Sequence, residues 1–140
     1  MVYFDTSVAI ALFVPEPTSE AAEAWFAFCT DRLVSSDWLL TEFASALLSK
    51  ARRKEIAKTQ ATAIWKYFWE FSRCGLRLPP VSRSAFDAAA RLARNVASGL
   101  RSGDSQHLAM AIEAGAACMA TTDGNLAKNA TTNGVAVEWF

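Results

Sequence analysis

The chain has 140 residues, of which 52% are hydrophobic, and this length and apolar content fit one compact domain over residues 1–140. Three widely separated cysteines argue against a disulfide framework or a paired-cysteine zinc site, so we expect a cytoplasmic protein. No stretch approaches the roughly 20 apolar residues of a membrane span, and the apolar run near the N-terminus lacks the basic lead-in of a signal peptide. We therefore expect no membrane association.

The net charge is zero, but the two signs are segregated along the chain. Residues 50–101 hold 12 basic and three acidic side chains, whereas the remainder holds two basic and 11 acidic ones. A basic segment of this kind is typical of proteins that bind a polyanion, because basic side chains displace counterions from phosphates. Ordinary solvent-facing helices give the same pattern, so charge alone leaves both interpretations open.

Strands and helices alternate from the N-terminus. A short buried strand over 2–4 precedes a short helix over 7–13, which Pro15 and Pro17 end because proline cannot continue a helix. The next three elements are expected to be a helix from Thr18 or Ser19 to Phe28, a strand over 32–35, and a helix from a Ser36 or Asp37 cap to about Arg53.

A helix over about 59–72 carries aromatic side chains at three- and four-residue steps, which favours packing against the core or a partner chain over a ligand role. These aromatic residues are Trp65, Phe68, Trp69 and Phe71. Residues 76–81 are expected to form the next strand. Pro79 and Pro80 confine that strand to a sheet edge, because they remove two hydrogen-bond donors.

The second half of the chain continues the alternation, with a loop bracketed by Gly99 and Gly103. Its elements are expected to be a helix from Ser82 or Ser84 to about Ala97, a helix from Asp104 to Gly115, a strand over 117–121, a short helix over 126–130 and a strand over 135–139. Because parallel neighbours need crossover connections, this alternation predicts an α/β fold with a mostly parallel sheet and helices on both faces.

Acidic residues fall where the strands of such a sheet end, which is where ligands bind in open parallel sheets. Asp5 directly follows the first strand, and Asp123 follows the 117–121 strand by two residues. Glu42 lies in the opening turns of the helix after the second strand, and Asp104 opens a helix entered from the same side. The sequence therefore predicts that four carboxylates gather at one edge of the sheet.

Four neighbouring carboxylates repel one another unless a cation neutralises them. Oxygen ligands without a Cys or His cluster favour Mg²⁺ or Mn²⁺ over zinc or copper. A site of this kind supports phosphodiester hydrolysis, because a bound ion lowers the pKa of a water molecule. Asp5, Asp104 and Asp123 are the expected metal ligands, and Glu42 completes the site or orients the attacking water.

Each acid also has a purely structural interpretation. Asp5 and Asp104 suit helix starts, and Asp123 with Gly124 is an ordinary turn pair. Glu42 is harder to explain in this way, because small residues share its helix face and leave space around its carboxylate. Those residues are Ser45, Ala46 and Ser49.

Four motifs in order resemble the PIN-domain family, and within it the small VapC-type toxins of bacterial and archaeal toxin–antitoxin pairs. They are Tyr3-Phe4-Asp5-Thr6-Ser7-Val8, Thr41-Glu42-Phe43, Gly103-Asp104-Ser105-Gln106-His107-Leu108-Ala109 and Thr121-Thr122-Asp123. The resemblance covers essentially the whole chain. It implies a three-layer α/β/α sandwich with about five mostly parallel strands, an acidic metal pocket, RNA cleavage, and inhibition by a cognate antitoxin.

The resemblance also implies roles for residues near the acids. Thr122 resembles a hydroxyl residue that hydrogen-bonds a ligand carboxylate, and Thr6 and Asn125 are expected in the same outer layer. Asn125 stands where some relatives carry another acid, which leaves one-metal and two-metal chemistry both open. His107 is one helical turn from Asp104, within reach of its carboxylate, and we interpret it as a packed, hydrogen-bonded residue rather than as the general base.

The basic segment offers candidate RNA contacts at Arg52, Arg53, Lys54, Lys58 and Arg101, which would hold phosphates without reading bases. Four tryptophans and the 52% apolar content exceed what a small monomer easily buries, which indicates a protein partner, and a homodimer and a bound antitoxin are both compatible with this. The four tryptophans are Trp25, Trp65, Trp69 and Trp139. Two alternatives remain at this stage, namely a PIN fold that binds RNA or a partner without cutting, and a magnesium-dependent receiver-like regulatory module.

Overall fold

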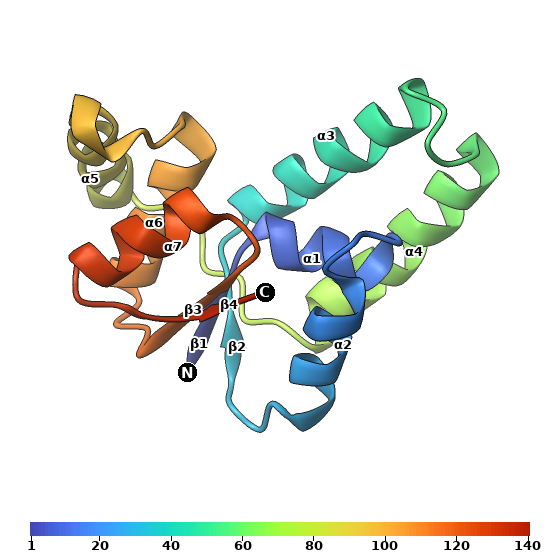
Figure 1. The fold of residues 1–140 in the computed structure, drawn as a ribbon, viewed down its shortest axis with the longest axis horizontal. Coiled ribbons are helices and arrows are strands. Elements are labelled where there is room, and N and C mark those ends of the chain that lie inside the picture. Colours follow the sequence, from blue (N-terminus) through green and yellow to red (C-terminus); the bar gives the residue numbers. More distant parts are fainter.

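A four-stranded parallel sheet lies at the centre of the computed structural model, which describes all 140 residues (Figure 1). The strand order is β2-β1-β3-β4, so the first strand of the chain lies inside the sheet. The strands are β1 (Val2–Phe4), β2 (Leu33–Val34), β3 (Cys118–Thr121) and β4 (Ala136–Trp139). All three pairings are parallel, as the alternation of strands and helices predicts.

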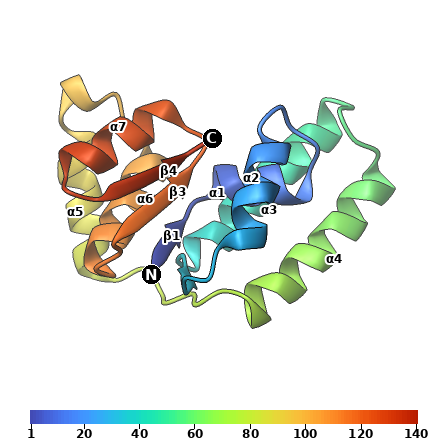
Figure 2. The ribbon, with the colours of Figure 1, turned by 60° about the horizontal axis from the view of Figure 1, so that its bottom comes forward.

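Helices cover both faces of this sheet (Figures 1 and 2). One face packs against α1 (Thr6–Phe13), α2 (Ser19–Phe28), α3 (Trp38–Arg52) and α4 (Lys58–Cys74). The other packs against α5 (Arg83–Ala93), α6 (Ser102–Glu113) and α7 (Gly124–Thr132). Two separate hydrophobic clusters fill the two interfaces, which confirms the predicted three-layer α/β/α class.

Side chains of the central strands alternate between the two clusters. Val2, Phe4 and Ala120 belong to the cluster under α1, α3 and α4, whereas Tyr3 and Met119 belong to the cluster under α6 and α7. This alternation follows from the two-residue period of a strand. It also determines which side chains meet just beyond the strand ends, where the candidate site lies.

The sheet has four strands rather than about five, because the segment after α4 forms only a single bridge at its edge. Arg77 pairs with Val34 of β2, and its backbone exchanges hydrogen bonds with Leu33 and Ser35. Pro79 accepts a bond from Asp37 but has no N–H to continue the ladder. The predicted edge position is confirmed, and the predicted strand is shortened to one residue.

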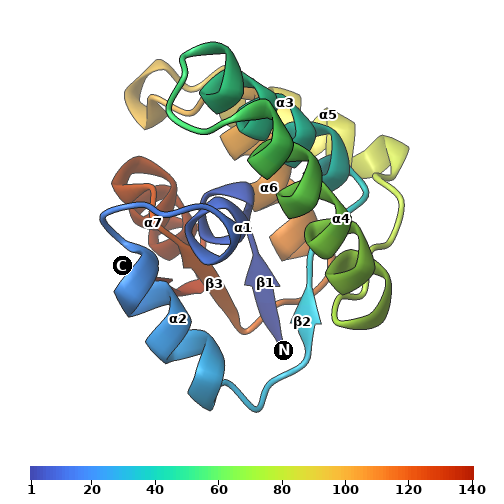
Figure 3. The ribbon, with the colours of Figure 1, turned by 90° about the vertical axis from the view of Figure 1, so that its right-hand side faces the viewer.

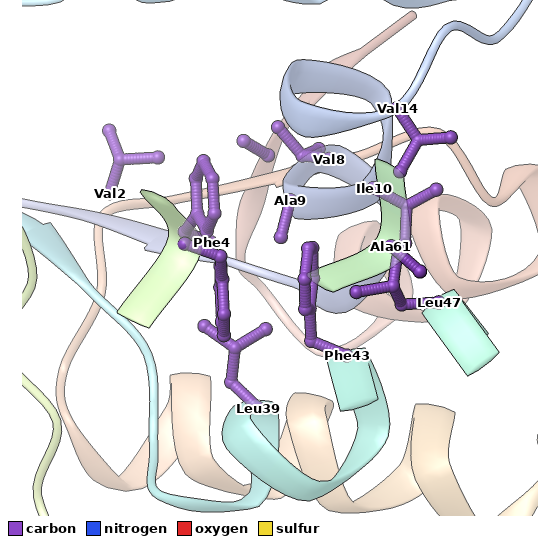
Figure 4. Close-up of a cluster of buried hydrophobic side chains, with 12 residues drawn as sticks. Val2, Phe4, Val8, Ala9, Ile10, Val14, Leu39, Phe43, Leu47 and Ala61 are labelled. Carbon is purple, nitrogen blue, oxygen red and sulfur yellow. The ribbon is translucent and has the colours of Figure 1, made fainter. Parts of the chain in front are cut away.

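Aliphatic and aromatic side chains fill the core between the sheet and the α3–α4 hairpin (Figure 4). Phe43 of α3 and Phe68 of α4 are both fully buried, and their rings stack with centroids 3.6 Å apart. Phe13 of α1 contacts both rings edge-on. The predicted packing role is confirmed for Phe68, Trp65 and Phe71, which lie in or against this cluster, whereas Trp69 is exposed.

The α3–α4 hairpin extends away from the sheet, with its turn at the far end (Figures 1 and 3). Lys54 in this turn has a positive φ of 62°, and ion pairs from Lys50 and Arg53 to Glu55 hold the turn closed. As a result of this arrangement, α3 begins near the carboxyl ends of the strands and runs away from the sheet.

Several predicted element boundaries change. The helix after Ser82 ends at Ala93 rather than near Ala97, because Asn95 caps a separate 3-10 turn over Val96–Ser98 through its side chain. Gly103 lies in the first turn of α6 rather than in a loop, so Asp104 is the third residue of that helix and not its first. No helix is long and apolar enough to cross a membrane.

Candidate active site

A cavity of about 590 Å³ opens at the carboxyl ends of β1 and β3, and all four predicted acids line it. Asp5, Glu42, Asp104 and Asp123 come from four separate segments of the chain, and each stands at or near the start of a helix. The sequence-based expectation that they gather at one edge of the sheet agrees with this placement.

Asp5 is the most deeply buried acid of the cavity, with 3% of its surface exposed. It caps α1 by accepting the Val8 N–H, and its carboxylate also accepts the hydroxyls of Ser7 (2.7 Å) and Thr121 (2.9 Å). Burial raises the pKa of Asp5, while His107 and these hydrogen bonds act in the opposite direction. A buried carboxylate with a raised pKa gains from a nearby cation.

Thr121, rather than Thr122, is the hydroxyl residue that bonds a site carboxylate. Its Oγ1 donates to Asp5 and accepts the N–H of Asp123 at 3.0 Å, so it links two acids of the cavity. The prediction for Thr122 is wrong, because only the backbone N–H of Thr122 makes a hydrogen bond here, to Ser7. Parallel register explains the difference: Phe4 pairs with Ala120, so Asp5 and Thr121 are the next neighbours and point to the same side.

Glu42 is held by two side chains from other helices. The Thr6 hydroxyl donates to Oε2 of Glu42, and Nε2 of His107 lies 2.8 Å from the same oxygen. Burial by itself would raise the pKa of Glu42, but the His107 hydrogen bond and charge, with the Thr6 hydroxyl, lower it below its ordinary value. Glu42 therefore stays ionised more readily than a free glutamate, and the outer-layer role predicted for Thr6 agrees with its place beside this carboxylate.

His107 contacts Glu42 rather than Asp104, which corrects the expected neighbour. It is buried and hydrogen-bonded on both ring nitrogens, since Nδ1 lies 3.0 Å from the Tyr3 hydroxyl. Burial raises the pKa of Tyr3, so this hydroxyl keeps its proton. Because the ionised Glu42 carboxylate can only accept a hydrogen bond, Nε2 of His107 carries a proton and donates to it. The interpretation of His107 as a packed, hydrogen-bonded residue is confirmed.

Gly103 allows α6 to approach Glu42 closely. A Cβ at this position would overlap with Oε1 of Glu42, so any larger residue would displace either the carboxylate or the helix. The sequence suggested a loop at Gly103, and this contact was not predicted. The position of Gly103 one residue before an acid in a helix start was the available indication, because glycine is disfavoured inside helices without a packing reason.

Asp104 and Asp123 are half-buried on the other side of the cavity. Asp104 accepts the Arg101 N–H at 3.0 Å, and Asp123 accepts the N–H groups of Asn125 and Leu126 at 2.8 Å. The pKa of Asp104 is raised, first by burial and then by the charges of Asp123 and Glu42, against the Arg101 hydrogen bond. This mutual repulsion is the electrostatic cost of bringing the acids together.

The donor set fits a hard divalent cation. Every candidate ligand is a carboxylate oxygen, no cysteine lines the cavity, and the single histidine is turned onto Glu42 and Tyr3. No three Asp, Glu, His or Cys side chains converge closely enough to hold an ion by themselves. Each carboxylate instead bonds donors of its own local segment or of a neighbouring strand or helix.

The predicted RNA-contacting residues are divided by the structure. Arg53 lines the cavity, and so does Lys50, which the sequence analysis did not single out. Arg52 and Lys58 border a separate apolar groove between α3 and α4. Lys54 and Arg101 are exposed and do not line the cavity, and Asn125 is also exposed, reaching Asp123 only through its backbone N–H.

Ser7 is a further site residue that sequence reasoning missed. Its hydroxyl donates to Asp5 and accepts the Thr122 N–H at 2.8 Å, so it joins the end of β1 to the segment after β3. The indication in the sequence was its position two residues after a strand-end acid, where a hydroxyl bonds an aspartate at a helix start.

The PIN-domain family model matches residues 2–131. No curated protein sequence matches the chain significantly. Among solved structures, the chain resembles VapC20 of Mycobacterium tuberculosis, described as a sarcin-ricin loop cleaving toxin, with a TM-score of 0.74 and 19% identity over 92% of this chain and 95% of that one.

Two further structures belong to toxin–antitoxin systems. VapBC2 of Rickettsia felis, bound to a DNA fragment from its promoter, matches with a TM-score of 0.67 and 14% identity, covering 100% of this chain and 99% of that one. VapBC-5 of Mycobacterium tuberculosis matches with a TM-score of 0.62 and 21% identity, covering 99% and 95%. At these identities, the likeness establishes a shared fold.

Proposed function

The chain belongs to the PIN-domain family, and we propose that it is a metal-dependent endoribonuclease that acts as the toxin of a toxin–antitoxin pair. The observation that carries the proposal is the convergence of four carboxylates, from four chain segments, in one cavity at the carboxyl ends of parallel strands. The resemblance in fold to an RNA-cleaving toxin supports RNA as the substrate.

Asp5, Asp104 and Asp123 would hold Mg²⁺ or Mn²⁺, with water and a substrate phosphate as the remaining ligands. When bound, the ion supplies an activated water and stabilises charge on the phosphate. Because too few side chains converge to hold an ion alone, the site is complete only when RNA brings its phosphate. Asn125 adds no carboxylate to the cavity, so the number of ions is a separate question.

The protein's own residues orient the acids. Ser7 and Thr121 hold Asp5 in one rotamer, and Thr121 also fixes the backbone of Asp123. Thr6 and His107 hold Oε2 of Glu42, and Oε1 lies against Gly103, so the carboxylate that would orient an attacking water is fixed in place. The Tyr3 hydroxyl holds the His107 ring at Nδ1, the nitrogen that does not face Glu42.

We propose further that a cognate antitoxin binds the protein, that the protein forms a homodimer, and that residues 1–140 act as a single cytoplasmic ribonuclease domain. Support comes from the toxin–antitoxin complexes among the similar structures and from aromatic side chains left at the surface. Trp69 is 39% exposed and Trp139 is 65% exposed, whereas Trp25 and Trp65 pack partly against the core.

The direct test is RNA cleavage by the wild type and by Asp5→Asn and Asp104→Asn, with Asp87→Asn on the surface of α5 as the matched control. We expect Mg²⁺- or Mn²⁺-dependent cleavage that falls by at least about 100-fold in the two site variants, since loss of a ligand costs more than loss of its outer partner. The control should cleave as the wild type does, because Asp87 pairs only with Arg83 at the surface.

Cleavage that survives both substitutions or a chelator would contradict the proposal. RNA binding without any cleavage would instead support a non-cleaving PIN fold, the alternative that the exposed Asn125 side chain favours. The PIN-domain match over residues 2–131 argues against the receiver-like interpretation.

A further inference from the structure

We propose that Lys50 and Arg53 form a phosphate-binding subsite, which holds the RNA backbone a few nucleotides from the scissile bond and on one side of it only. The inference rests on the proposed ribonuclease function and extends the same cavity. In the protein without RNA, Glu16 and Glu55 hold these two cations in place.

One stripe of α3 connects the acidic site to the two cations. The stripe runs from Glu42 through Ser45, Ala46 and Ser49 to Lys50 and Arg53, and all six residues line the same cavity. They are spaced at three- and four-residue steps, so they share one helix face. The small side chains in the middle leave a trough between the carboxylates and the cations.

The length of this stripe gives the reach of the subsite. At a rise of about 1.5 Å per residue, Lys50 lies about 12 Å and Arg53 about 16 Å beyond Glu42 along the helix axis. A stacked nucleic acid strand advances about 3.4 Å per nucleotide, so the cations would meet phosphates about three to five nucleotides from the cleaved bond. Because α3 runs outward from the sheet in one direction, only one side of the RNA reaches them (Figure 1).

The chemistry of the trough suits a phosphate backbone rather than bases. Lys50 offers an ammonium and Arg53 a guanidinium, which bind phosphate oxygens, and the hydroxyls of Ser45 and Ser49 add neutral donors. No Phe, Tyr or Trp side chain lines the cavity, so an unpaired base finds no aromatic surface on which to stack. Contacts here would therefore position RNA without reading its sequence.

The two glutamates differ in how readily they can be displaced. The Lys50 side chain is 15% exposed and contacts Glu16, whose side chain is 24% exposed. Glu55 is 44% exposed and shares its carboxylate between Lys50 (3.1 Å) and Arg53 (2.6 Å). The Glu16 hydrogen bond raises the pKa of Lys50, so the ammonium stays charged. Phosphate would displace the exposed Glu55 carboxylate and leave Lys50 supported by Glu16.

The test measures how binding depends on RNA length. In a non-cleaving Asp5→Asn background, affinities are measured for a long RNA and for versions shortened from either end. Shortening from one end should weaken binding to the background protein, and this length dependence should be smaller in Asp5→Asn/Lys50→Met, where only the Arg53 contact remains. Loss of one phosphate contact should weaken binding by about fivefold near 0.1 M salt and lower the slope of log affinity against log salt by about 0.7.

Matched variants separate the subsite from general charge. Lys66→Met removes an exposed lysine of α4 outside the cavity and should leave the length dependence unchanged. Glu55→Gln removes the competing carboxylate and should tighten binding of the long RNA, whereas Glu70→Gln on exposed α4 should not. The Glu55 variant also guards against a folding defect in Lys50→Met, since a merely structural ion pair would not give tighter binding when broken.

The outcomes distinguish the two proposals. If the wild type cleaves RNA but Lys50→Met keeps the wild-type length dependence and Glu55→Gln does not tighten binding, the subsite is wrong and the ribonuclease stands. If the wild type neither binds nor cleaves any RNA, the proposed function is wrong and the subsite with it.

Discussion

The two ends of the cavity are built in opposite ways. At the acidic end, side chains from distant segments are joined by buried or part-buried hydrogen bonds, such as those from Asp5 to Thr121 and from Glu42 to His107. At the basic end, Lys50 and Arg53 come from one helix and are held by partly exposed ion pairs. Buried bonds to charged groups are costly to break, whereas exposed pairs contribute little and weaken with salt.

Precise side-chain positions are needed at the acidic end and not at the basic end. The acidic end must hold oxygens in fixed positions, and its geometry depends on strand register and on the contact between α3 and α6. The basic end needs only charge along a helix face, and its side chains can exchange partners. Adding one methyl group at the acidic end should therefore lower cleavage strongly. Removing one charge at the basic end should weaken RNA binding only modestly.

Gly103→Ala adds a single methyl group at the acidic end and should lower cleavage strongly. Its Cβ would overlap with Oε1 of Glu42, so the carboxylate must move or α6 must shift. A displacement of about 1 Å at a reacting group costs on the order of 100-fold in rate, and we expect a loss of that size in RNA cleavage assays.

Gly124→Ala is the matched control for that substitution. Gly124 also lies in the first turn of a site helix, but a Cβ there would meet only Trp139 at an ordinary distance of 3.7 Å. Equal losses in the two variants would show that the contact with Glu42 has no special role.

The second prediction compares the activities of two variants that each lose one hydroxyl, Thr121→Val and Thr122→Val. Thr121→Val removes the donor to Asp5 and the acceptor of the Asp123 N–H while keeping the side-chain volume. Loss of such an outer partner costs about 10- to 100-fold in metal affinity or activity, measurable by Mn²⁺ titration and cleavage assays. Thr122→Val should change little, because only the backbone of Thr122 is bonded; a larger effect there would reverse the assignment.

The smallest effect is a pH dependence of stability caused by the buried acid itself. The pKa of Asp5 is raised in the folded state, so the folded protein holds this proton more tightly than the unfolded chain. The stabilisation is present below the ordinary pKa of 3.8 and is lost as pH rises through the folded-state value. A variant without this carboxylate should not lose that stability as the pH rises.

Asp5→Asn should therefore gain stability relative to the wild type as pH rises from about 4 to neutrality, by about 1.4 kcal/mol for each unit of pKa elevation. Urea unfolding with a chelator present measures the difference at each pH. Asp87→Asn, at an exposed position on α5, is the control and should show no such trend. A pH-independent difference for Asp5→Asn would mean that burial does not penalise this carboxylate.

Much of the fold could be predicted because it depends on local pattern. The period of β1, the helical spacing in α4 and the prolines after α1 identify the elements, and strand ends locate Asp5 and Asp123. The fifth strand was overestimated because two prolines interrupt it, and α5 was extended past the point where Asn95 begins a separate turn.

The missed features of the site depend on contacts between distant segments. The choice between Thr121 and Thr122 requires the register of β1 against β3, and the partner of His107 requires knowing that α6 packs beside α3. Lys50 was overlooked although it lies eight residues after Glu42 on the same helix face, since its relevance depends on the cavity continuing along that face. Strand register and helix packing are tertiary properties that cannot be read from the local pattern of a single sequence.

The proposed mechanism depends on Asp5, Asp104 and Asp123 binding a divalent ion together, and direct Mn²⁺ binding tests this without relying on catalysis. Binding should be measured for the wild type, Asp5→Asn, Asp104→Asn and Asp87→Asn, with a short non-cleavable RNA analogue supplying the phosphate. We expect Mn²⁺ affinity to fall at least about tenfold in the two cavity variants, to stay unchanged in Asp87→Asn, and to weaken for the wild type when the analogue is omitted. Equal Mn²⁺ affinity in all four proteins would contradict the claim.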